Sequence, residues 1–219
     1  MNVSAERRSA PGGADAGHGG GSGNVTRGLA ALIGLPGFDI VRPANAQETA
    51  VAWRRMEVHS ERPAGIALNR GSLPVFARPD IGNVDDAARG AYVLVEAGSG
   101  APEVILIAVG PLVQVAADAA IVLEMTGVPT RVVSMPCWQW FLEEAAPYHQ
   151  SVLPPAVSSR VSVDSEQEPV LRTLVGDRGE CLTFPTAARP DRRVPESRGL
   201  AEELIVAAAR RSARRYAGA

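Results

Sequence analysis

The sequence predicts an α/β protein with a mostly parallel sheet, and two observations lead to this prediction. First, residues 102–110 form an apolar, β-branched run that ends at Gly110, as expected for a strand buried on both faces. A helical pattern over 111–127 and a second apolar run over 130–136 follow, so this stretch is predicted to be a βαβ unit with a right-handed crossover. Second, strands and helices alternate along most of the chain, which is typical of a parallel sheet flanked by helices.

The chain begins with a segment that has little to bury. Residues 1–24 are rich in Gly, Ser and Ala. Because such a segment cannot offset the entropy cost of becoming ordered, residues 1–24 are predicted to be a disordered tail.

Ordered structure is predicted from residue 25 onward. A short helix with Leu29, Leu32 and Ile33 is followed by a strand over 38–42, a helix over 45–58 and a strand over 65–69. Asn45 is the predicted N-cap of the longer helix, because Glu48 follows three residues later as in a capping box. Residues 74–86 lack a clear period and are predicted to connect two domains.

The elements on either side of the βαβ unit complete the second domain. A strand over 91–95 precedes the unit. After it, the pattern predicts a short helix over 138–144, an irregular passage over 148–153, a strand over 160–163, a helix over 170–175, a strand over 179–184 and a last helix from Ser197 to about residue 214.

Composition excludes several classes of partner. The formal net charge of -2 gives no electrostatic reason to expect a nucleic acid or an anionic membrane as partner. The chain contains arginine but no lysine, a usage typical of a GC-rich, actinobacterial-type genome. Two cysteines are too few for a disulfide framework, and no apolar run reaches the ~20 residues that span a bilayer. We therefore expect a soluble, cytoplasmic protein.

The sequence shows no self-contained catalytic or metal site. Cys137, His149 and Cys181 stand apart from one another, whereas metal ligation needs clustered ligands. Adjacent Glu143 and Glu144 would point in different directions on a helix, which favours a solvated face over a catalytic carboxylate pair. The aromatic side chains at 138, 140 and 141 are more typical of core or interface anchors than of a ligand platform.

Arg70 is the one residue whose position suggests binding. It lies at the carboxyl end of a predicted strand, where α/β sheets place ligand-binding groups. A guanidinium there could hold a phosphate or a carboxylate, although position alone favours a surface salt bridge.

Several ordered motifs resemble the C-terminal part of transketolases, over about residues 25–214. The segment 41–53 (VRPANAQETAVAW) and the strand 66–70 (IALNR) resemble parts of the family's pyrimidine-binding domain. The family's C-terminal domain is similar to segments 90–94 (GAYVL), 102–108 (PEVILIA), 131–141 (RVVSMPCWQWF), 151–154 (SVLP) and 175–180 (VGDRGE). After the tail over 1–24, the resemblance implies a partial pyrimidine-binding domain over 25–88 and a transketolase C-terminal domain over 89–219 with a mostly parallel five-stranded sheet.

The resemblance also implies what other chains must provide. The sequence has no match to the family's Gly-Asp-Gly metal motif, to the glutamate that activates thiamine diphosphate, or to the active-site histidines. Thiamine diphosphate and Mg would therefore be held only by partner subunits, which carry the diphosphate-binding domain and the catalytic glutamate. Arg70 matches the family's arginine that contacts the substrate phosphate, while Asn69 and the segment 164–168 (DSEQE) depart from the family's pattern.

Two functions follow from these expectations. The leading hypothesis is the C-terminal subunit of a split transketolase-like enzyme that transfers a two-carbon ketol unit between ketose and aldose substrates and is inactive alone. The alternative is a non-catalytic binding or regulatory module that keeps the transketolase C-terminal fold.

Overall fold

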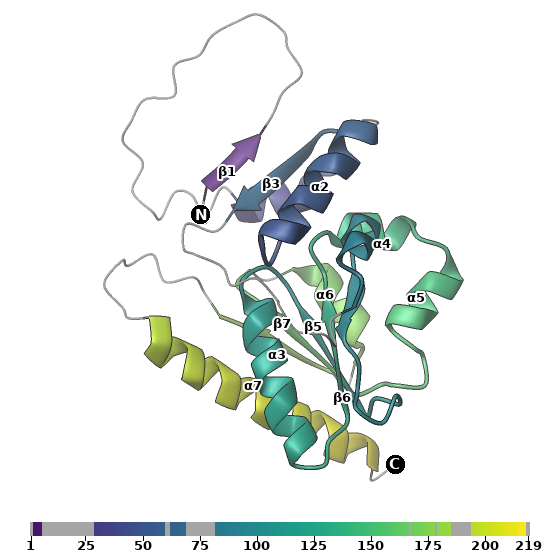
Figure 1. Ribbon diagram of the computed structural model, residues 1–219, viewed down its shortest axis with the longest axis vertical. Coiled ribbons are helices and arrows are strands. Elements are labelled where there is room, and N and C mark those ends of the chain that lie inside the picture. Colours follow the sequence, from purple (N-terminus) through teal and green to yellow (C-terminus); the bar gives the residue numbers. More distant parts are fainter. Residues whose placement is uncertain are drawn as a thin grey trace, which may run out of the picture.

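The computed structural model describes residues 2–5, 29–59, 62–68, 82–166, 168–177, 179–184 and 194–217, which build two β-sheets (Figure 1). We call residues 29–68 the first unit and residues 82–217 the C-terminal unit. The first unit contains a helical turn over 29–33 and the elements β2 (Asp39–Val41), α2 (Ala46–Val58) and β3 (Ala64–Leu68). β3 is the central strand of a three-stranded sheet, parallel to β2 and antiparallel to β1 (Asn2–Ala5).

The C-terminal unit is built on a five-stranded sheet with the order β4-β6-β5-β7-β8. Its strands are β4 (Tyr92–Val95), β5 (Val104–Ala108), β6 (Thr130–Ser134), β7 (Arg160–Asp164) and β8 (Glu180–Thr183). Only the edge strand β4 is antiparallel to its neighbour, and the other pairs are parallel. The prediction of a mostly parallel five-stranded sheet is confirmed.

The central strand β5 is buried on both faces, as its apolar run predicts. Val104, Leu106 and Ala108 belong to one hydrophobic cluster, while Ile105 and Ile107 belong to another. The alternation places the two sets on opposite faces, because successive side chains of a strand point to opposite sides. The predicted βαβ unit is confirmed, since α3 (Leu112–Met125) connects β5 to the parallel strand β6.

Helices cover both faces of this sheet (Figure 1). α3 and the long α7 (Val194–Ala217) pack together on one face and share the first hydrophobic cluster. The opposite cluster takes buried side chains from α4 (Trp138–Glu143), α5 (Ala146–Val152) and α6 (Pro169–Val175). The resulting arrangement is a three-layer α/β unit.

The N-cap predicted for α2 is confirmed in its main feature. The amide of Glu48 donates to the Asn45 Oδ1 atom at 2.8 Å. The Glu48 carboxylate returns to the amide of Ala44 at 2.7 Å, one residue before the position that a standard capping box uses. This shift leaves Glu48 completely inside the protein, with 1% of its surface exposed.

Three elements differ from the sequence-based expectations. Residues 148–153 were expected to be irregular, but α5 forms there because Pro147 lies in the first helical turn, where a missing amide costs no hydrogen bond. α7 begins at Val194, before the expected cap at Ser197. Strand β1 lies within the segment 1–24 that was expected to be a disordered tail, and its backbone pairs with β3 from Asn2 to Ala5.

Two other expectations are not tested by the described residues. The boundary predicted between 88 and 89 falls in the 3₁₀ helix η1 (Val84–Arg89) and stays a prediction. Residues 69–81, which include Arg70 and most of the predicted connector, lie outside the described residues. Across the ranges that are described, no helix is both long enough and apolar enough to cross a membrane.

Candidate functional site

The predicted binding residue Arg70 lies outside the described residues, so the candidate site is built from the elements that lead to it. β3 ends at Leu68, two positions before Arg70. β2 runs beside it in parallel, with Val41 opposite Ile66. Both strands therefore end at the same edge of the three-stranded sheet, and Arg42 is the first residue after β2.

Arg42 reaches the carboxyl edge of the five-stranded sheet. Its backbone amide donates to the Pro136 oxygen at 2.7 Å, just after β6. Gly110, which follows β5, comes so close that a Cβ atom there would lie 3.8 Å from the Arg42 carbonyl oxygen. β6 and β7 flank β5 on opposite sides, so this edge is the topological switch point at which α/β sheets usually bind ligands.

The Arg42 guanidinium fills this switch point and pairs with acidic groups there. Nη1 donates to Asp164 Oδ2 at 2.8 Å and to Glu168 Oε1 at 2.7 Å. Nη2 donates to the other oxygen of Asp164 and, at 2.9 Å, to the Ser165 hydroxyl. Burial alone would lower the pKa of Arg42, but the hydrogen bonds and charges of Asp164 and Glu168 raise it above its ordinary value. The guanidinium is therefore a fixed cation that joins the two units.

Three carboxylates surround this single cation. We call Arg42, Asp164, Glu166 and Glu168 the Arg42 cluster; each member has at most 9% of its surface exposed. Burial raises the pKa of Glu168 to about 7, with Arg42 opposing and Asp164 reinforcing the shift. Burial also raises the pKa of Glu166, which Arg42 opposes in the same way. The cluster thus carries more negative than positive groups.

Glu48 forms a second junction between the units. Its Oε1 atom accepts hydrogen bonds from the Tyr92 hydroxyl at 2.9 Å and from the Ser134 hydroxyl at 2.7 Å. Tyr92 begins β4 and Ser134 ends β6, so one carboxylate of α2 contacts two strands of the other sheet. Burial raises the pKa of Glu48, although the hydrogen bonds from Ala44, Ser134 and Tyr92 oppose the shift.

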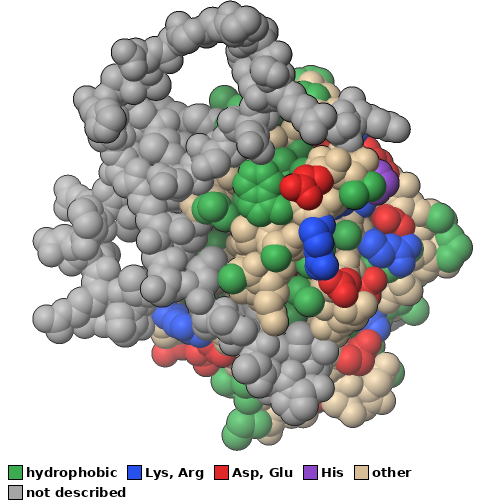
Figure 2. Space-filling model, turned by 45° about the horizontal axis from the view of Figure 1, so that its top comes forward, with side chains coloured by type: hydrophobic (Ala, Val, Ile, Leu, Met, Phe, Trp, Pro, Cys, Tyr) green, Lys and Arg blue, Asp and Glu red, His purple; other side chains and the backbone are tan. Residues whose placement is uncertain are grey.

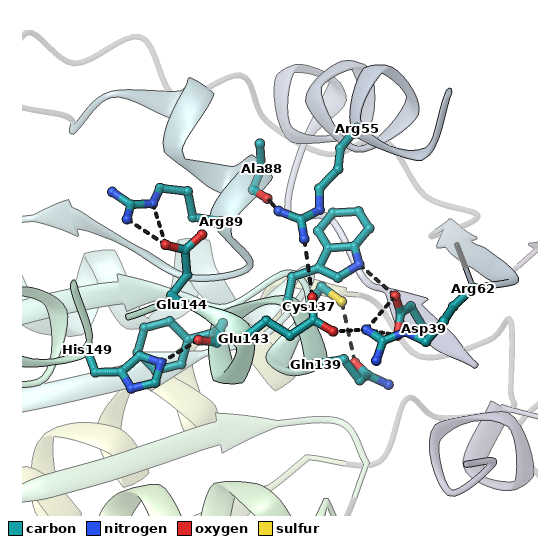
Figure 3. A network of polar contacts seen from close by, with 12 residues as sticks. Asp39, Arg55, Arg62, Ala88, Arg89, Cys137, Gln139, Glu143, Glu144 and His149 are labelled. Carbon is teal, nitrogen blue, oxygen red and sulfur yellow. Dashed lines mark hydrogen bonds and ion pairs between the residues drawn. The ribbon is translucent and has the colours of Figure 1, made fainter. Parts of the chain in front are cut away.

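A third junction surrounds α4 (Figure 3). The Trp140 indole donates to Asp39 Oδ2 at 2.9 Å, and the Arg55 guanidinium lies over the Trp140 ring, 4.4 Å from its centroid. Arg62 pairs with Asp39 at 3.1 Å and also contacts Glu143. Trp140 is therefore an interface anchor, whereas Phe141 packs in the core of the C-terminal unit, so both roles that the sequence favours occur.

The other candidates on and beside α4 also have structural contacts. Glu143 and Glu144 do point apart, but both are ion-paired: Glu144 accepts from Arg89 at 2.6 Å (Figure 3). The Cys137 thiol is buried, and burial raises its pKa. The His149 Nε2 atom lies 2.5 Å from the Phe141 carbonyl oxygen, on the α4 backbone. None of these groups meets another at the geometry of a catalytic pair.

The described residues do not offer a fit for a metal-bound diphosphate. No group of three or more His, Cys, Asp or Glu side chains within those ranges is arranged to hold a metal ion. The buried acidic groups of the Arg42 cluster already face a guanidinium. The described residues therefore contain no carboxylate or histidine group of the kind that holds a metal-bound diphosphate.

A groove of about 550 Å³ runs between the two units beside the Arg42 cluster. Its walls come from residues 33–39 and Arg62 of the first unit and from α4 and α6 of the C-terminal unit. Glu168 is one of its lining residues. On the face shown in Figure 2, hydrophobic side chains are mixed with charged ones.

Sequence reasoning missed the contacts that Arg42, Glu48 and the acidic segment after β7 make between the two units. Their local signals are weak: a charged residue before a proline, a glutamate near an N-cap, and acidic residues after a strand. The hydrogen bonds that define them join positions as far apart as 126 residues, which one sequence does not reveal.

Comparisons with known proteins agree with this architecture. Residues 90–186 match the family model for the transketolase-like TK C-terminal domain. The transketolase of Mycobacterium leprae is 43% identical over 161 residues, which cover 71% of this chain and 23% of that protein. The chain spans about a quarter of the length of the curated relatives that it matches.

Solved structures extend the likeness across both units. A transketolase structure from Pichia stipitis, in complex with xylulose 5-phosphate, superposes with a TM-score of 0.70 and 25% identity, covering 87% of this chain and 27% of that one. A structure described as a split gene transketolase, inactive beta4 tetramer, has a TM-score of 0.58 and 22% identity. It covers 85% of this chain and 60% of the other, and at this identity it shows a shared fold.

Proposed function

Starting from the transketolase-like C-terminal domain that this chain carries, we propose that the chain is the C-terminal subunit of a split, thiamine-diphosphate-dependent transketolase-like enzyme. In this proposal the assembled enzyme transfers a two-carbon ketol unit between sugar-type substrates, and this chain is inactive alone. The single observation that carries the proposal is the family match over residues 90–186, which continues into the first unit in the Pichia superposition.

The missing parts of the family pattern support a partner subunit. The 219 residues contain no match to the metal motif or to the activating glutamate of transketolases. Thiamine diphosphate supplies the reactive carbon that accepts and releases the two-carbon unit in such enzymes. Since the described residues do not fit that cofactor, its binding and the Mg site belong to the partner in this proposal. The neighbour described as a split gene transketolase is a precedent for dividing such an enzyme among chains.

The contribution of this chain would be substrate contact and geometry. Arg70 follows the end of β3 and would hold an anionic group of the substrate. The junctions around Arg42, Glu48 and Trp140 fix the first unit to the C-terminal unit. The carboxyl end of β3, which precedes Arg70, would thereby keep a defined orientation toward the partner subunit.

The first test is assembly. The chain is co-expressed with the transketolase-like subunits encoded beside its gene, and the mass of the product is measured by size-exclusion chromatography with light scattering, with and without thiamine diphosphate and Mg²⁺. We expect co-elution that the cofactor strengthens, and ketol transfer by the complex but not by either component. A chain that remains a stable monomer and binds none of these subunits would rule out the proposal.

The second test addresses Arg70 in the reconstituted complex. Arg70→Ala should raise KM for phosphorylated sugars by at least about tenfold, because a charge-assisted contact to the substrate is lost. Arg54→Ala is the matched control, since Arg54 is an exposed arginine whose side chain contacts Asp85. Equal kinetics in both variants would remove Arg70 from the substrate site.

The non-catalytic module remains the second candidate, and one observation favours it. The departing segment 164–168 holds the Arg42 guanidinium at the switch point of the C-terminal sheet. A domain whose usual ligand position is filled in this way could serve purely as a binding module. Assembly with a partner but no ketol transfer under any substrate would select this function.

A further inference from the structure

The Arg42 cluster has an unbalanced charge in a buried position. Asp164, Glu166 and Glu168 bring three carboxyl groups to one guanidinium, and all are at least nine-tenths buried. With every group ionised the cluster would carry a net charge of about -2 in a medium that screens it poorly. Buried charges of this kind are usually neutralised by a partner or by a proton.

The hydrogen bonds within the cluster do not supply that neutralisation. Asp164 is held by both guanidinium nitrogens and by the amide of Ser165 at 2.6 Å. Glu168 accepts from Arg42 through Nη1 alone. Glu166 Oε1 and Arg42 Nε are buried without a hydrogen-bond partner. Of the two carboxylates that contact Arg42 directly, Glu168 is therefore held less firmly than Asp164.

No other charged group of the described surroundings compensates for Glu168. The groove that Glu168 lines also contains Asp39 and Glu143, which are acidic, and Arg62, which is basic. Arg62 is already paired with both of these carboxylates. The groove thus adds more acidic than basic groups, and Glu168, with 3% of its side chain exposed, would reach water there only by turning.

We propose that the Arg42 cluster is a proton-dependent latch, in which a protonated Glu168 keeps Arg42 and strand β2 firmly on the C-terminal sheet. In the closed latch the neutral carboxyl accepts from Arg42 while leaving Asp164 as the charged partner. After the proton leaves, Arg42 attracts the Glu168 carboxylate, but the cost of burying this charge and the repulsion from Asp164 and Glu166 are larger. The carboxylate therefore turns toward the groove, where it gains hydration. Arg42 then loses one of its acceptors, and the contact between the two units loosens.

The direction of the pH effect follows from linkage. The pKa of Glu168 in the folded protein, about 7, lies above its ordinary value of 4.5. The folded state therefore holds this proton between those values while the unfolded state has lost it. The stabilisation is fully present below about pH 4.5 and is lost as the pH rises through about 7.

The direct test is a carboxyl ¹³C NMR titration of the full chain, in which the Glu168 resonance is assigned by its absence in Glu168→Gln. The expected midpoint lies near pH 7. A midpoint in the ordinary glutamate range, about 4 to 5, would overturn the proposal. The midpoint is read from the wild-type protein, and Glu168→Asp provides the assignment if Glu168→Gln folds poorly.

A second measurement reads the latch itself. Hydrogen exchange of the Arg42 amide, which donates to Pro136, is followed from about pH 5 to about pH 8.5 and corrected for the intrinsic exchange rate. Its protection should decrease about tenfold or more across this range in the wild type and change little in Glu168→Gln. Parallel profiles in the two proteins would show that Glu168 does not control the contact.

The control is Glu103→Gln, which changes an exposed glutamate outside the cluster. It should keep the pH dependence of the wild type. Since these measurements use the chain alone, their outcome is independent of whether the chain assembles with a partner or takes part in ketol transfer. If the protection of the Arg42 amide depends on pH as weakly in Glu103→Gln as in Glu168→Gln, the assignment to Glu168 is also overturned.

Discussion

The guanidinium of Arg42 and the carboxylate of Asp164 form a two-pronged ion pair between residues 122 positions apart. Arg42 directly follows β2 of the first unit, and Asp164 ends β7 of the five-stranded sheet. Both side chains are almost completely buried, with 3% and 2% of their surfaces exposed. The pair is thus the point at which the carboxyl edges of two sheets are joined.

Asp164→Asn should destabilise the protein by about 3 kcal/mol, because it leaves a buried guanidinium without its main counter-charge. Urea denaturation at neutral pH measures this difference. The matched control is Asp85→Asn, which removes the ion pair of Asp85 with Arg54, whose side chains are 69% and 67% exposed. The control should cost less than about 1 kcal/mol. Equal costs in the two variants would show that Asp164 is not a buried counter-charge.

Gly90→Ala should prevent α4 from packing against the turn that precedes β4. Gly90 has φ +87°, and a Cβ atom there would lie 2.3 Å from the Cys137 oxygen and 2.4 Å from the Phe141 nitrogen. We expect a loss of about 3 kcal/mol or more in the free energy of unfolding.

Gly100→Ala separates this clash from the cost of the backbone angle. Gly100 has φ +74°, and a Cβ atom at that position would meet nothing within 4 Å, so the variant carries the conformational cost alone. This variant should lose about 1 kcal/mol. Thermal unfolding measures the loss of stability in both variants. Similar losses in Gly90→Ala and Gly100→Ala would contradict the packing described for Gly90.

The two cysteines should react with thiol reagents at very different rates. Cys181 is exposed, whereas Cys137 is buried and its pKa is raised by that burial. Labelling of the native protein with a maleimide should modify Cys181 promptly. Cys137 should react about a thousandfold more slowly, because the reagent reaches it only when the structure around α4 opens locally. Mass spectrometry of digested samples measures both rates. Prompt labelling of Cys137 in native protein would mean that α4 does not cover it stably.

Glu48→Ala should cost about 3 kcal/mol, because three buried donors lose their acceptor. These donors are the Ala44 amide and the hydroxyls of Tyr92 and Ser134. The control Glu57→Ala changes an exposed glutamate of the same helix and should alter stability by less than about 0.5 kcal/mol. Chemical denaturation compares them, and a small effect at Glu48 would exclude it as a junction between the units.

Local patterns were sufficient to predict most of the fold. The apolar run of β5 and the helical spacing of α3 leave signatures within a few residues, because burial on both faces dictates each position. The N-cap at Asn45 is likewise local. α5 was missed because its seven residues are too few to show a helical period, and its start depends on Pro147.

The polar junctions could not be predicted in the same way. Glu48 is recognisable as a capping residue, but its contacts to Tyr92 and Ser134 depend on how two sheets dock. Arg42 and Asp164 each look like ordinary polar residues near the end of a strand. The resemblance to transketolases identified Arg70, which lies outside the described residues, and that assignment stays a prediction.

The separation of Arg42 from Asp164 also has a consequence for the synthesis of the protein. Arg42 leaves the ribosome 122 residues before its counter-charge. Until β7 emerges, the end of β2 has no acidic partner, and the switch point that it fills does not exist. During translation the first unit therefore lacks this buried junction until the C-terminal sheet has been synthesised. Formation of the junction between the two units is thus a late step, because it needs residues from distant parts of the chain.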